Sequence, residues 1–249
     1  MREVVSSFDG AGAGGQFQTT LWSVVLQAAK EPSTQSWEAL AKLCRTYWYP
    51  VYAFLRRQGK SPHDAQDLTQ AFFIHLLHHD RLAQVRPEKG RFRSFLLAAL
   101  KNFLSDQREK TQAQKRGGGV EVISLDAHTA EQRYAMEPVE RLDPEKIYER
   151  RWAMTLLDRV LERLESEFAV AGKAERFKYL STLLVGEADS ESYATVGKRL
   201  GMTAGAVKVA VLRLRQRYRE LFRVEVSDTV VNQAELEEEM RHVFAALKG

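Results

Sequence analysis

Apolar residues recur at three- and four-residue intervals along most of the chain, which is the spacing of amphipathic helices. Such patterns occupy 17–115, continue over 145–222 and return at 233–247. Strand-like alternation is confined to 120–125. We therefore predict an all-α protein.

Residues 192–223 predict two helices joined by a tight turn. Gly201 ends the first helix, because glycine accepts the positive φ of a helix end, and Thr203 can cap the second. Gly197 is small where the two helices must cross. A short helix, a glycine turn and a longer helix form a helix-turn-helix, whose second helix can enter the DNA major groove. The two apolar seams are Tyr193, Val196, Leu200 and then Val207, Val211, Leu214, Tyr218, Phe222.

Charge strengthens the DNA interpretation of this segment. Between 203 and 223 the chain carries six Lys or Arg residues and one acid, Glu220, a net charge of +5. The alternative is an ordinary helical hairpin with a solvated basic face.

The charge map of the whole chain suggests a polyanionic partner touched at two places. The net charge over 249 residues is only +4. Residues 86–116 hold nine cations and three acids, net +6, whereas 224–249 hold two cations and six acids, net −4.

The pattern predicts two small helical domains joined by a long linker. We expect a flexible arm over 1–16, a helical domain over 17–115 and a linker over 116–144. A helix-turn-helix domain over 145–224 and an acidic helical extension over 225–249 follow. The one cysteine, Cys44, excludes an intrachain disulfide. Without a signal peptide or a long apolar run, we expect a cytoplasmic protein with no membrane insertion.

Residues 61–77 predict a well-capped helix with a polar face. Ser61 fits the N-cap, Pro62 the first helical position, and Asp64 the capping box. Asp64, Asp67 and Gln70 share one face at three-residue spacing. This face is either solvated, with acids favoured near the helix N-terminus, or a docking surface.

Residues 90–110 predict a helix with a buried stripe of Phe92, Leu96, Ala99 and Phe103. Cations and amides surround the stripe, and such groups can follow phosphates and contact unpaired bases. The alternative is a core helix with basic flanks.

Three motifs in order, 64-DAQDLTQAFFIHLL-77, 91-RFRSFLLAALKNFLSDQREK-110 and 192-SYATVGKRLGMTAGAVK-208, resemble bacterial RNA polymerase sigma factors of the extracytoplasmic-function (ECF) type. The resemblance covers about 35–115 and 145–223. The segments 216-QRYRELFRVEV-226 and 235-ELEEEMRHVF-244 resemble a subgroup with a C-terminal extension.

The resemblance implies a sigma factor that directs promoter recognition, DNA melting and transcription initiation, with no cofactor, metal or catalytic residue of its own. The first domain would be a region-two bundle that docks on the clamp helices of the largest polymerase subunit and melts the minus-ten element. The second would be a region-four domain that contacts the polymerase flap and recognises the minus-thirty-five element as duplex. An anti-sigma regulator is a further partner compatible with the family.

The resemblance also assigns residues to each surface. The docking positions are Asp64, Gln66, Asp67 and Gln70. The minus-ten positions are Arg91, Arg93, Phe95, Lys101, Asn102 and Arg108. The minus-thirty-five positions are Thr203, Gly205, Lys208, Arg213, Arg215 and Arg217.

One departure concerns the recognition helix. After Lys208, where many family members place a polar residue and an arginine, this chain has Val209 and Ala210. Sequence recognition would then depend on apolar contact with thymine methyls or on DNA shape.

Two other classes compete with the sigma factor. A stand-alone helix-turn-helix regulator would explain 192–223 but not the first domain. An enzyme finds little support, because Gly10, Gly12 and Gly15 lack the strand-to-helix context of a nucleotide fingerprint. His75, His78, His79 and Asp80 could suggest a metal site, but helix-end histidines are the simpler account.

The acidic tail allows two interpretations. Its seam of Leu236, Met240, Val243 and Leu247 could place it against the recognition helix or the second domain, where it would mask DNA binding. Alternatively, it caps the hydrophobic core of a domain.

Overall fold

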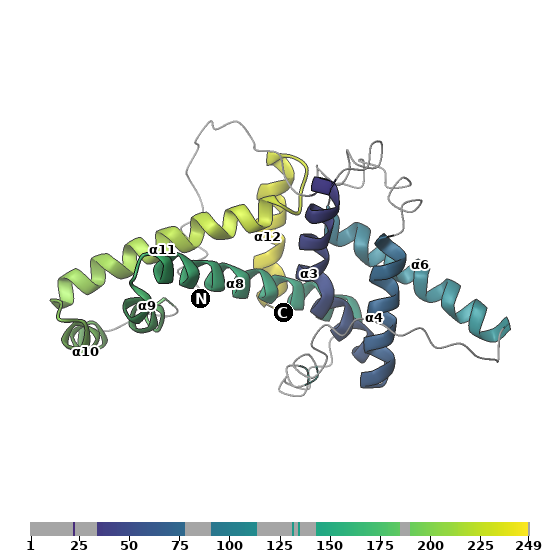
Figure 1. Cartoon of the computed structure of the whole chain (residues 1–249), viewed down its shortest axis with the longest axis horizontal. Helices are drawn as coiled ribbons and strands as arrows, with labels where there is room; N and C mark the ends of the chain where they lie inside the picture. The colour runs from purple at the N-terminus through teal and green to yellow at the C-terminus, as the bar shows by residue number, and fades with distance from the viewer. Residues whose placement is uncertain are drawn as a thin grey trace. The chain divides into compact units, whose positions relative to one another are not determined.

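The computed structural model describes residues 22, 34–77, 91–113, 131, 134, 143–184 and 190–248. In this part of the chain the regular structure is entirely helical, as predicted (Figure 1). The glycine-rich arm, the strand candidate at 120–125 and almost all of the predicted linker lie outside the described residues.

The described residues form two compact units that do not follow chain order. The large unit combines residues up to Thr155 with 227–248, and the small unit comprises 156–184 and 190–226. The predicted boundary at 116–144 and the separate extension at 225–249 stay predictions, and the structure groups the last helix with the first ones.

Two consecutive helices begin the large unit, α3 (Thr34–Arg57) and α4 (Pro62–Leu77). Gly59 turns the chain between them with φ 83°. The predicted cap of α4 is confirmed, since the Asp64 amide donates to Ser61 Oγ at 3.1 Å. The Asp64 carboxylate accepts from the Ser61 hydroxyl at 2.7 Å, and in this way the cap fixes the start of α4.

The core of the large unit is aromatic where α3 meets α6 (Phe92–Ala113). Tyr47 of α3 is fully buried and its ring centroid lies 4.9 Å from that of Phe92 and 6.3 Å from that of Trp152. Trp152 lies in the first part of α8 (Pro144–Val170), which belongs to this unit. Of the predicted α6 stripe, Phe92, Leu96 and Phe103 are buried, whereas Ala99 is half-buried.

Trp22 and the turn before the last helix both contact neighbours at the start of α6 or each other. The Trp22 backbone amide donates to the Asp228 carbonyl at 3.0 Å, and the Phe92 amide donates to the Thr229 carbonyl at 3.1 Å. The Trp22 ring packs on Phe92 and stacks on Phe95, with centroids 4.9 and 5.4 Å apart. The last helix, α12 (Gln233–Lys248), follows directly.

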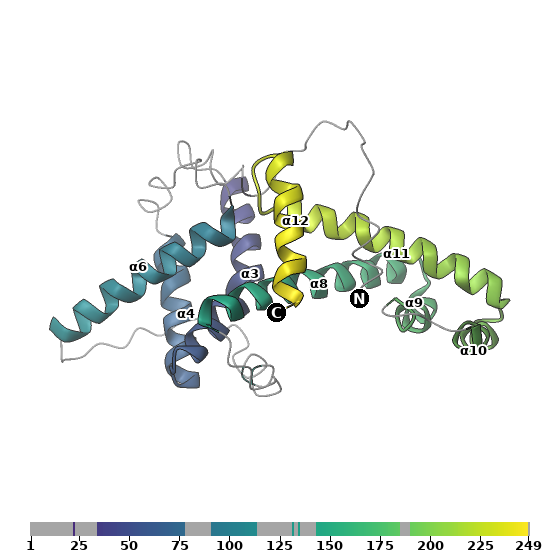
Figure 2. The same cartoon turned by 180° about the vertical axis from the view of Figure 1, so that it is seen from behind.

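The small unit contains the helix-turn-helix. After the second part of α8 come α9 (Ala174–Ser181), α10 (Ser190–Leu200) and α11 (Ala204–Ser227). Figures 1 and 2 show α9 and α10 side by side near the start of α11. Gly201 has φ 62°, as its place at the helix end predicts. The Ala206 amide donates to Thr203 Oγ1 at 3.2 Å, which confirms the predicted cap of α11.

Candidate nucleic-acid interface

Helix α11 presents one exposed stripe opposite its buried seam. Val207, Val211 and Leu214 are buried, as predicted, and side chains three or four positions apart share a helix face. The exposed stripe comprises Gly205, Lys208, Val209, Leu212, Arg213 and Gln216. A stripe of this length at the start of the second helix of a helix-turn-helix is the surface that can enter a major groove.

The structure separates the cations of α11 into two groups. Arg215 donates from Nη2 to the Leu183 carbonyl at 3.0 Å. Arg217 donates to both carboxylate oxygens of Glu167, at 2.9 and 2.8 Å, and to Glu220 at 2.9 Å. The hydrogen bond from Arg217 lowers the pKa of Glu167. These two arginines therefore serve contacts within the small unit.

Lys208 and Arg213 form the other group. Both are exposed, and neither pairs with any residue that the structure describes. Of the predicted minus-thirty-five positions, Thr203 caps the helix and Gly205 has open space where a Cβ would stand. Lys208 and Arg213 are thus the two exposed cations on this stripe of α11.

Two large apolar side chains lie between these cations. Val209 is 49% exposed and Leu212 is 63% exposed. Isolated exposed apolar residues need no explanation, but these two are three positions apart on the stripe that also carries both cations. Apolar groups at this position match the thymine methyl in the major groove.

Helix α4 presents the predicted acidic face only in part. The Asp67 side chain is 61% exposed and pairs with His63 Nδ1 at 3.1 Å. Asp64 is exposed and Gln66 is half-buried. Gln70, the third member of the predicted face, is only 9% exposed. The Gln70 side chain is therefore nearly buried, and the exposed part of this face consists mainly of Asp64 and Asp67.

The second half of α6 keeps its predicted polar surface. Lys101, Asn102 and Arg108 are exposed. Lys101 pairs with Glu145, and both side chains are nearly half exposed, so that solvent screens this pair. Asn102 and Arg108 bond to no residue within the described part of the chain. These turns therefore offer two cations and an amide to solvent.

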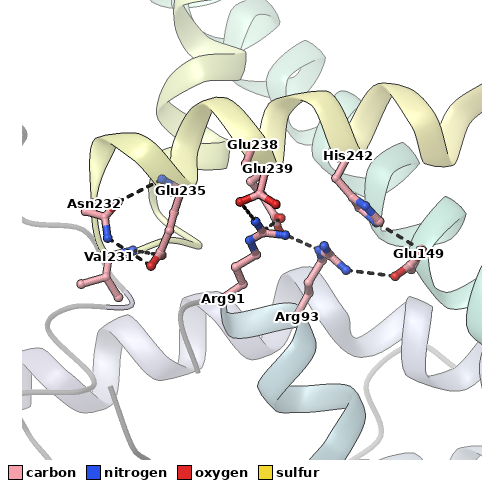
Figure 3. A network of polar contacts seen from close by, with 9 residues as sticks. All are labelled: Arg91, Arg93, Glu149, Val231, Asn232, Glu235, Glu238, Glu239 and His242. Atoms are coloured by element: carbon pink, nitrogen blue, oxygen red, sulfur yellow. Dashed lines mark hydrogen bonds and ion pairs between the residues drawn. The ribbon is translucent and has the colours of Figure 1, made fainter. Parts of the chain in front are cut away.

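The start of α6 has a different environment, which Figure 3 shows. Arg93 is only 6% exposed; it donates to Glu239 at 2.7 Å and to Glu149 at 2.9 Å, and its guanidinium lies over the Trp152 ring. Arg91 pairs with Glu238 and lies 3.4 Å from Glu239. Both arginines belong to the minus-ten positions that the resemblance implies, and that assignment stays a prediction. In the structure Arg93 is buried and pairs with α12 and α8.

Phe95, another of the implied minus-ten positions, lies at the edge of the core. It is half-buried and stacks on Trp22, so that it belongs to the aromatic cluster at the start of α6. The periodicity of the α6 seam identified its buried stripe but not the segments that cover the neighbouring positions.

The beginning of α12 is fixed by its own cap. The Glu235 amide donates to Asn232 Oδ1 at 3.0 Å, and the Val231 amide donates to Glu235 Oε2 at 3.2 Å. Leu236, Met240 and Val243 are buried, as the predicted seam requires, and Leu247 is half-buried. Burying three such side chains stabilises docking by roughly 5–9 kcal/mol, which is an upper estimate.

Charge is concentrated beneath α12. Glu239 is fully buried, yet both neighbouring arginines face it. His242 Nε2 lies 3.2 Å from Glu149 Oε2, and this contact, with Arg93 beyond it, holds the pKa of Glu149 below its usual value. A buried carboxylate needs such partners, because an unpaired one is strongly destabilising.

The structure bears on the predicted alternatives for the tail within the large unit. Helix α12 caps a hydrophobic core, but its ion pairs go to the start of α6 and the start of α8. These contacts support the interpretation of the tail as a cap on a hydrophobic core, and masking of the recognition helix or the second domain stays a prediction. The pairing of Glu239 with Arg93 spans 146 positions of sequence, and no local signal announces it.

Metal and redox chemistry find no support in the described residues. No group of three potential ligands occurs among them. His75 packs on Phe103, with ring centroids 5.2 Å apart. The other members of the predicted metal cluster, His78, His79 and Asp80, lie outside the described residues. The glycines of the fingerprint, Gly10, Gly12 and Gly15, also lie outside them.

Burial raises the pKa of the Cys44 thiol to about 12, typical of a structural cysteine. No described helix is long and apolar enough to cross a bilayer.

Comparison with known proteins finds one matching family and one similar protein. Residues 43–114 match the sigma-70 region 2 family. The chain is also similar to the ECF RNA polymerase sigma factor SigE of Mycolicibacterium smegmatis, with 26% identity over 194 residues. That alignment covers 78% of this chain and 64% of the relative, so that the chain spans less than two thirds of the relative's length. No solved structure matches significantly.

Both findings support the resemblance to ECF-type sigma factors that the motifs predict. The matched segment contains α4 and α6 and ends before the helix-turn-helix. The subgroup with a C-terminal extension stays a prediction.

Proposed function

We propose that this chain, which carries a sigma-70 region 2 domain and resembles ECF sigma factors, binds core RNA polymerase and directs it to promoters. The observation that carries the proposal is the match over 43–114. This segment holds the exposed acids of α4 and the exposed cations of α6 on one compact unit.

The acidic face of α4 is the proposed polymerase contact. Asp64 and Asp67 are exposed and carry negative charge near the start of a helix. Acids at such a place attract a basic partner surface and contribute more to association rate and specificity than to affinity. Of the two amides assigned to this contact, Gln66 is half-buried and Gln70 is nearly buried.

The proposed promoter contacts divide between the two units. The exposed part of α6, with Lys101, Asn102 and Arg108, would hold the melted strand, since cations follow phosphates and amides contact unpaired base edges. The exposed stripe of α11 would enter the duplex major groove, with Lys208 and Arg213 on phosphates and Val209 on a thymine methyl.

Reconstitution tests the proposal. The full chain is mixed with sigma-free bacterial core polymerase and analysed by size exclusion at moderate salt. We expect a one-to-one complex that initiates transcription from a promoter which core polymerase alone does not open.

A stand-alone helix-turn-helix regulator is the second candidate, favoured by the geometry of α10 and α11. It predicts tight duplex binding without co-elution with polymerase. That outcome would reject the sigma factor and return the α4 acids to a solvated face.

A further inference from the structure

The start of α6 already has an anionic partner within the chain. Glu238 and Glu239 of α12 pair with Arg91 and Arg93, and Glu149 is a further partner of Arg93 (Figure 3). Carboxylates here occupy the place that DNA phosphates would take if these arginines bound a promoter strand.

We propose that α12 is a permanent part of the promoter-melting unit: it stays docked when promoter DNA binds, Arg91 and Arg93 serve α12 instead of the DNA strand, and the strand is held by the exposed turns of α6 from Lys101 onward. This inference rests on the proposed function. It concerns a segment outside the family match, which ends at residue 114.

Burial favours a docked helix over a displaceable cover. Leu236, Met240 and Val243 are each at most 3% exposed, and Glu239 is completely enclosed. A strand that displaced α12 would have to compensate for exposing these side chains. It would also have to replace every carboxylate beside Arg93, at a site where desolvation makes an unpaired charge costly.

Backbone contacts before α12 favour the same conclusion. The Asp228 and Thr229 carbonyls accept from the Trp22 and Phe92 amides. Lys42 of α3 pairs with the Asp228 carboxylate at 3.1 Å. Helix α12 is thus connected to the large unit through its leading turn as well as through its own face.

The consequence for DNA is a shift of the contact surface along α6. Arg91 and Arg93 lie two or more helical turns before Lys101, since a turn takes 3.6 residues. The exposed cations of the described part of α6 lie in these later turns. A melted strand would therefore meet α6 beyond the region that α12 covers.

Hydrogen exchange of the full chain tests the inference. Exchange of peptides from 233–248 is measured for the free protein and for its complex with core polymerase and a promoter bearing a pre-melted minus-ten segment. We expect protection in the complex to stay within about twofold of the free protein. A tenfold or greater acceleration would show that α12 leaves and would overturn the inference.

Salt dependence of binding to the same pre-melted promoter provides the second measurement. The logarithm of the DNA-binding constant falls linearly with the logarithm of the salt concentration. Each lost phosphate contact on single-stranded DNA decreases the steepness of this fall by about 0.7. We expect this decrease for Lys101→Gln and for Arg108→Gln. Arg91→Gln, which removes a partly covered cation, should leave the slope at its original value. A decrease of about 0.7 for Arg91→Gln, or an unchanged slope for both Lys101→Gln and Arg108→Gln, would overturn the inference.

Matched controls separate folding from binding. Glu237→Gln removes a charge from the exposed face of α12, and every variant is compared by circular dichroism before use. If no polymerase complex forms, the proposed function fails and the inference fails with it. If the complex forms while α12 exchanges freely, only the inference fails.

Discussion

A single missing side chain lets α10 and α11 cross. A Cβ at Gly197 would lie 2.6 Å from the Met202 carbonyl oxygen, a distance that side-chain carbons do not adopt. The same turn uses the Gly197 carbonyl, which accepts from the Met202 amide at 2.9 Å. The crossing therefore depends on glycine for space, whereas Gly201 in the same turn depends on glycine for its positive φ.

Gly197→Ala should destabilise the small unit. The overpacking costs about 1–3 kcal/mol, which exceeds the gain of about 0.5–1 kcal/mol from replacing a helical glycine by alanine. Thermal unfolding measures the change. Gly205→Ala is the matched control, because nothing lies within 4 Å of a Cβ there, and we expect an unchanged or slightly raised unfolding temperature. Equal effects of the two substitutions would contradict this account.

The exposed Val209 leads to a prediction about sequence recognition under the proposed function. If Val209 contacts a thymine methyl, replacing thymine by deoxyuridine in the upstream promoter element removes that contact and changes no hydrogen bond. Losing one methyl contact costs about 0.8 kcal/mol, or about fourfold in affinity. Binding titrations with the two DNAs measure it.

Val209→Ala is the complementary variant for this test. It should bind the thymine and deoxyuridine DNAs with nearly equal affinity, while Lys208 keeps its phosphate contact. If the original chain binds both DNAs equally, apolar recognition is wrong and DNA shape becomes the better explanation.

At the scale of elements, α12 is joined to the start of α6 by ion pairs. It places a buried arginine between two carboxylates and on the Trp152 ring. A buried ion pair is weak evidence for net stability, but breaking one by removing a partner is strongly destabilising. Removing one partner of this ion pair should therefore lower the free energy of unfolding more than replacing both partners at once.

Arg93→Ala should lower the free energy of unfolding of the large unit by about 3–5 kcal/mol, because it leaves Glu239 buried without its nearest cation. Lys101→Ala, which breaks a half-exposed pair on the same helix, should change it by at most about 1 kcal/mol. Denaturant unfolding measures both. The double variant Arg93→Met with Glu239→Gln should recover part of the loss. Similar stability of Arg93→Ala and Lys101→Ala would show that Arg93 is not buried as described.

The same network predicts a pH dependence. The folded state holds the pKa of Glu149 below the usual 4.5, so that its ionised form stabilises the fold above pH 4.5. This contribution is lost as the pH falls below 4.5 and through the lowered pKa. Arg93, Glu239 and His242 also face this site, and therefore the effect of Glu149 must be isolated by substitution.

Glu149→Gln should cost about 1.5–3 kcal/mol at pH 7, the usual contribution of hydrogen bonds to a charged group. The difference from the original chain should shrink as the pH drops below 4.5. Unfolding at several pH values measures it, and Glu162→Gln, at an exposed position of α8, serves as control. A difference that is constant with pH would contradict the assignment of the lowered pKa to Glu149.

The elements themselves could be predicted because their signals are local. Caps at Ser61 and Thr203, the positive φ of Gly201 and the seam of α12 each depend on neighbours within a few positions. The partners of Arg91 and Arg93 could not be predicted in this way. Periodicity identifies a buried face but not the segment that buries it, and a charge count does not show which cations are paired within the fold.

At the scale of the whole molecule, positive and negative charges are nearly balanced in number. They are nevertheless concentrated on separate helices. The net charge is +4, yet Glu238 and Glu239 of α12 pair with the arginines at the start of α6, and Glu167 and Glu220 pair with Arg217. The exposed charges that the proposed function uses are the acids of α4, the late cations of α6, and Lys208 and Arg213 of α11. Two of these three surfaces suit DNA and one suits a basic protein partner.

This division predicts that polymerase and duplex binding can be lost separately. Asp67→Asn removes an exposed acid of α4 and should weaken binding to core polymerase while leaving the affinity for promoter duplex unchanged. Arg213→Ala should weaken duplex binding and lower the salt slope by about 1, the effect of one phosphate contact. It should leave polymerase binding unchanged, since Arg213 lies on the stripe of α11 that is proposed to face the duplex.

Two titrations per variant, one with core polymerase and one with duplex, measure these effects, and Asp106→Asn controls for loss of an exposed acid elsewhere on the large unit. If either variant loses both activities while still folded, polymerase and duplex share one surface. That result would also remove the reason for assigning α4 and α11 to different partners, because the separate placement of their open charges is what the division of function depends on.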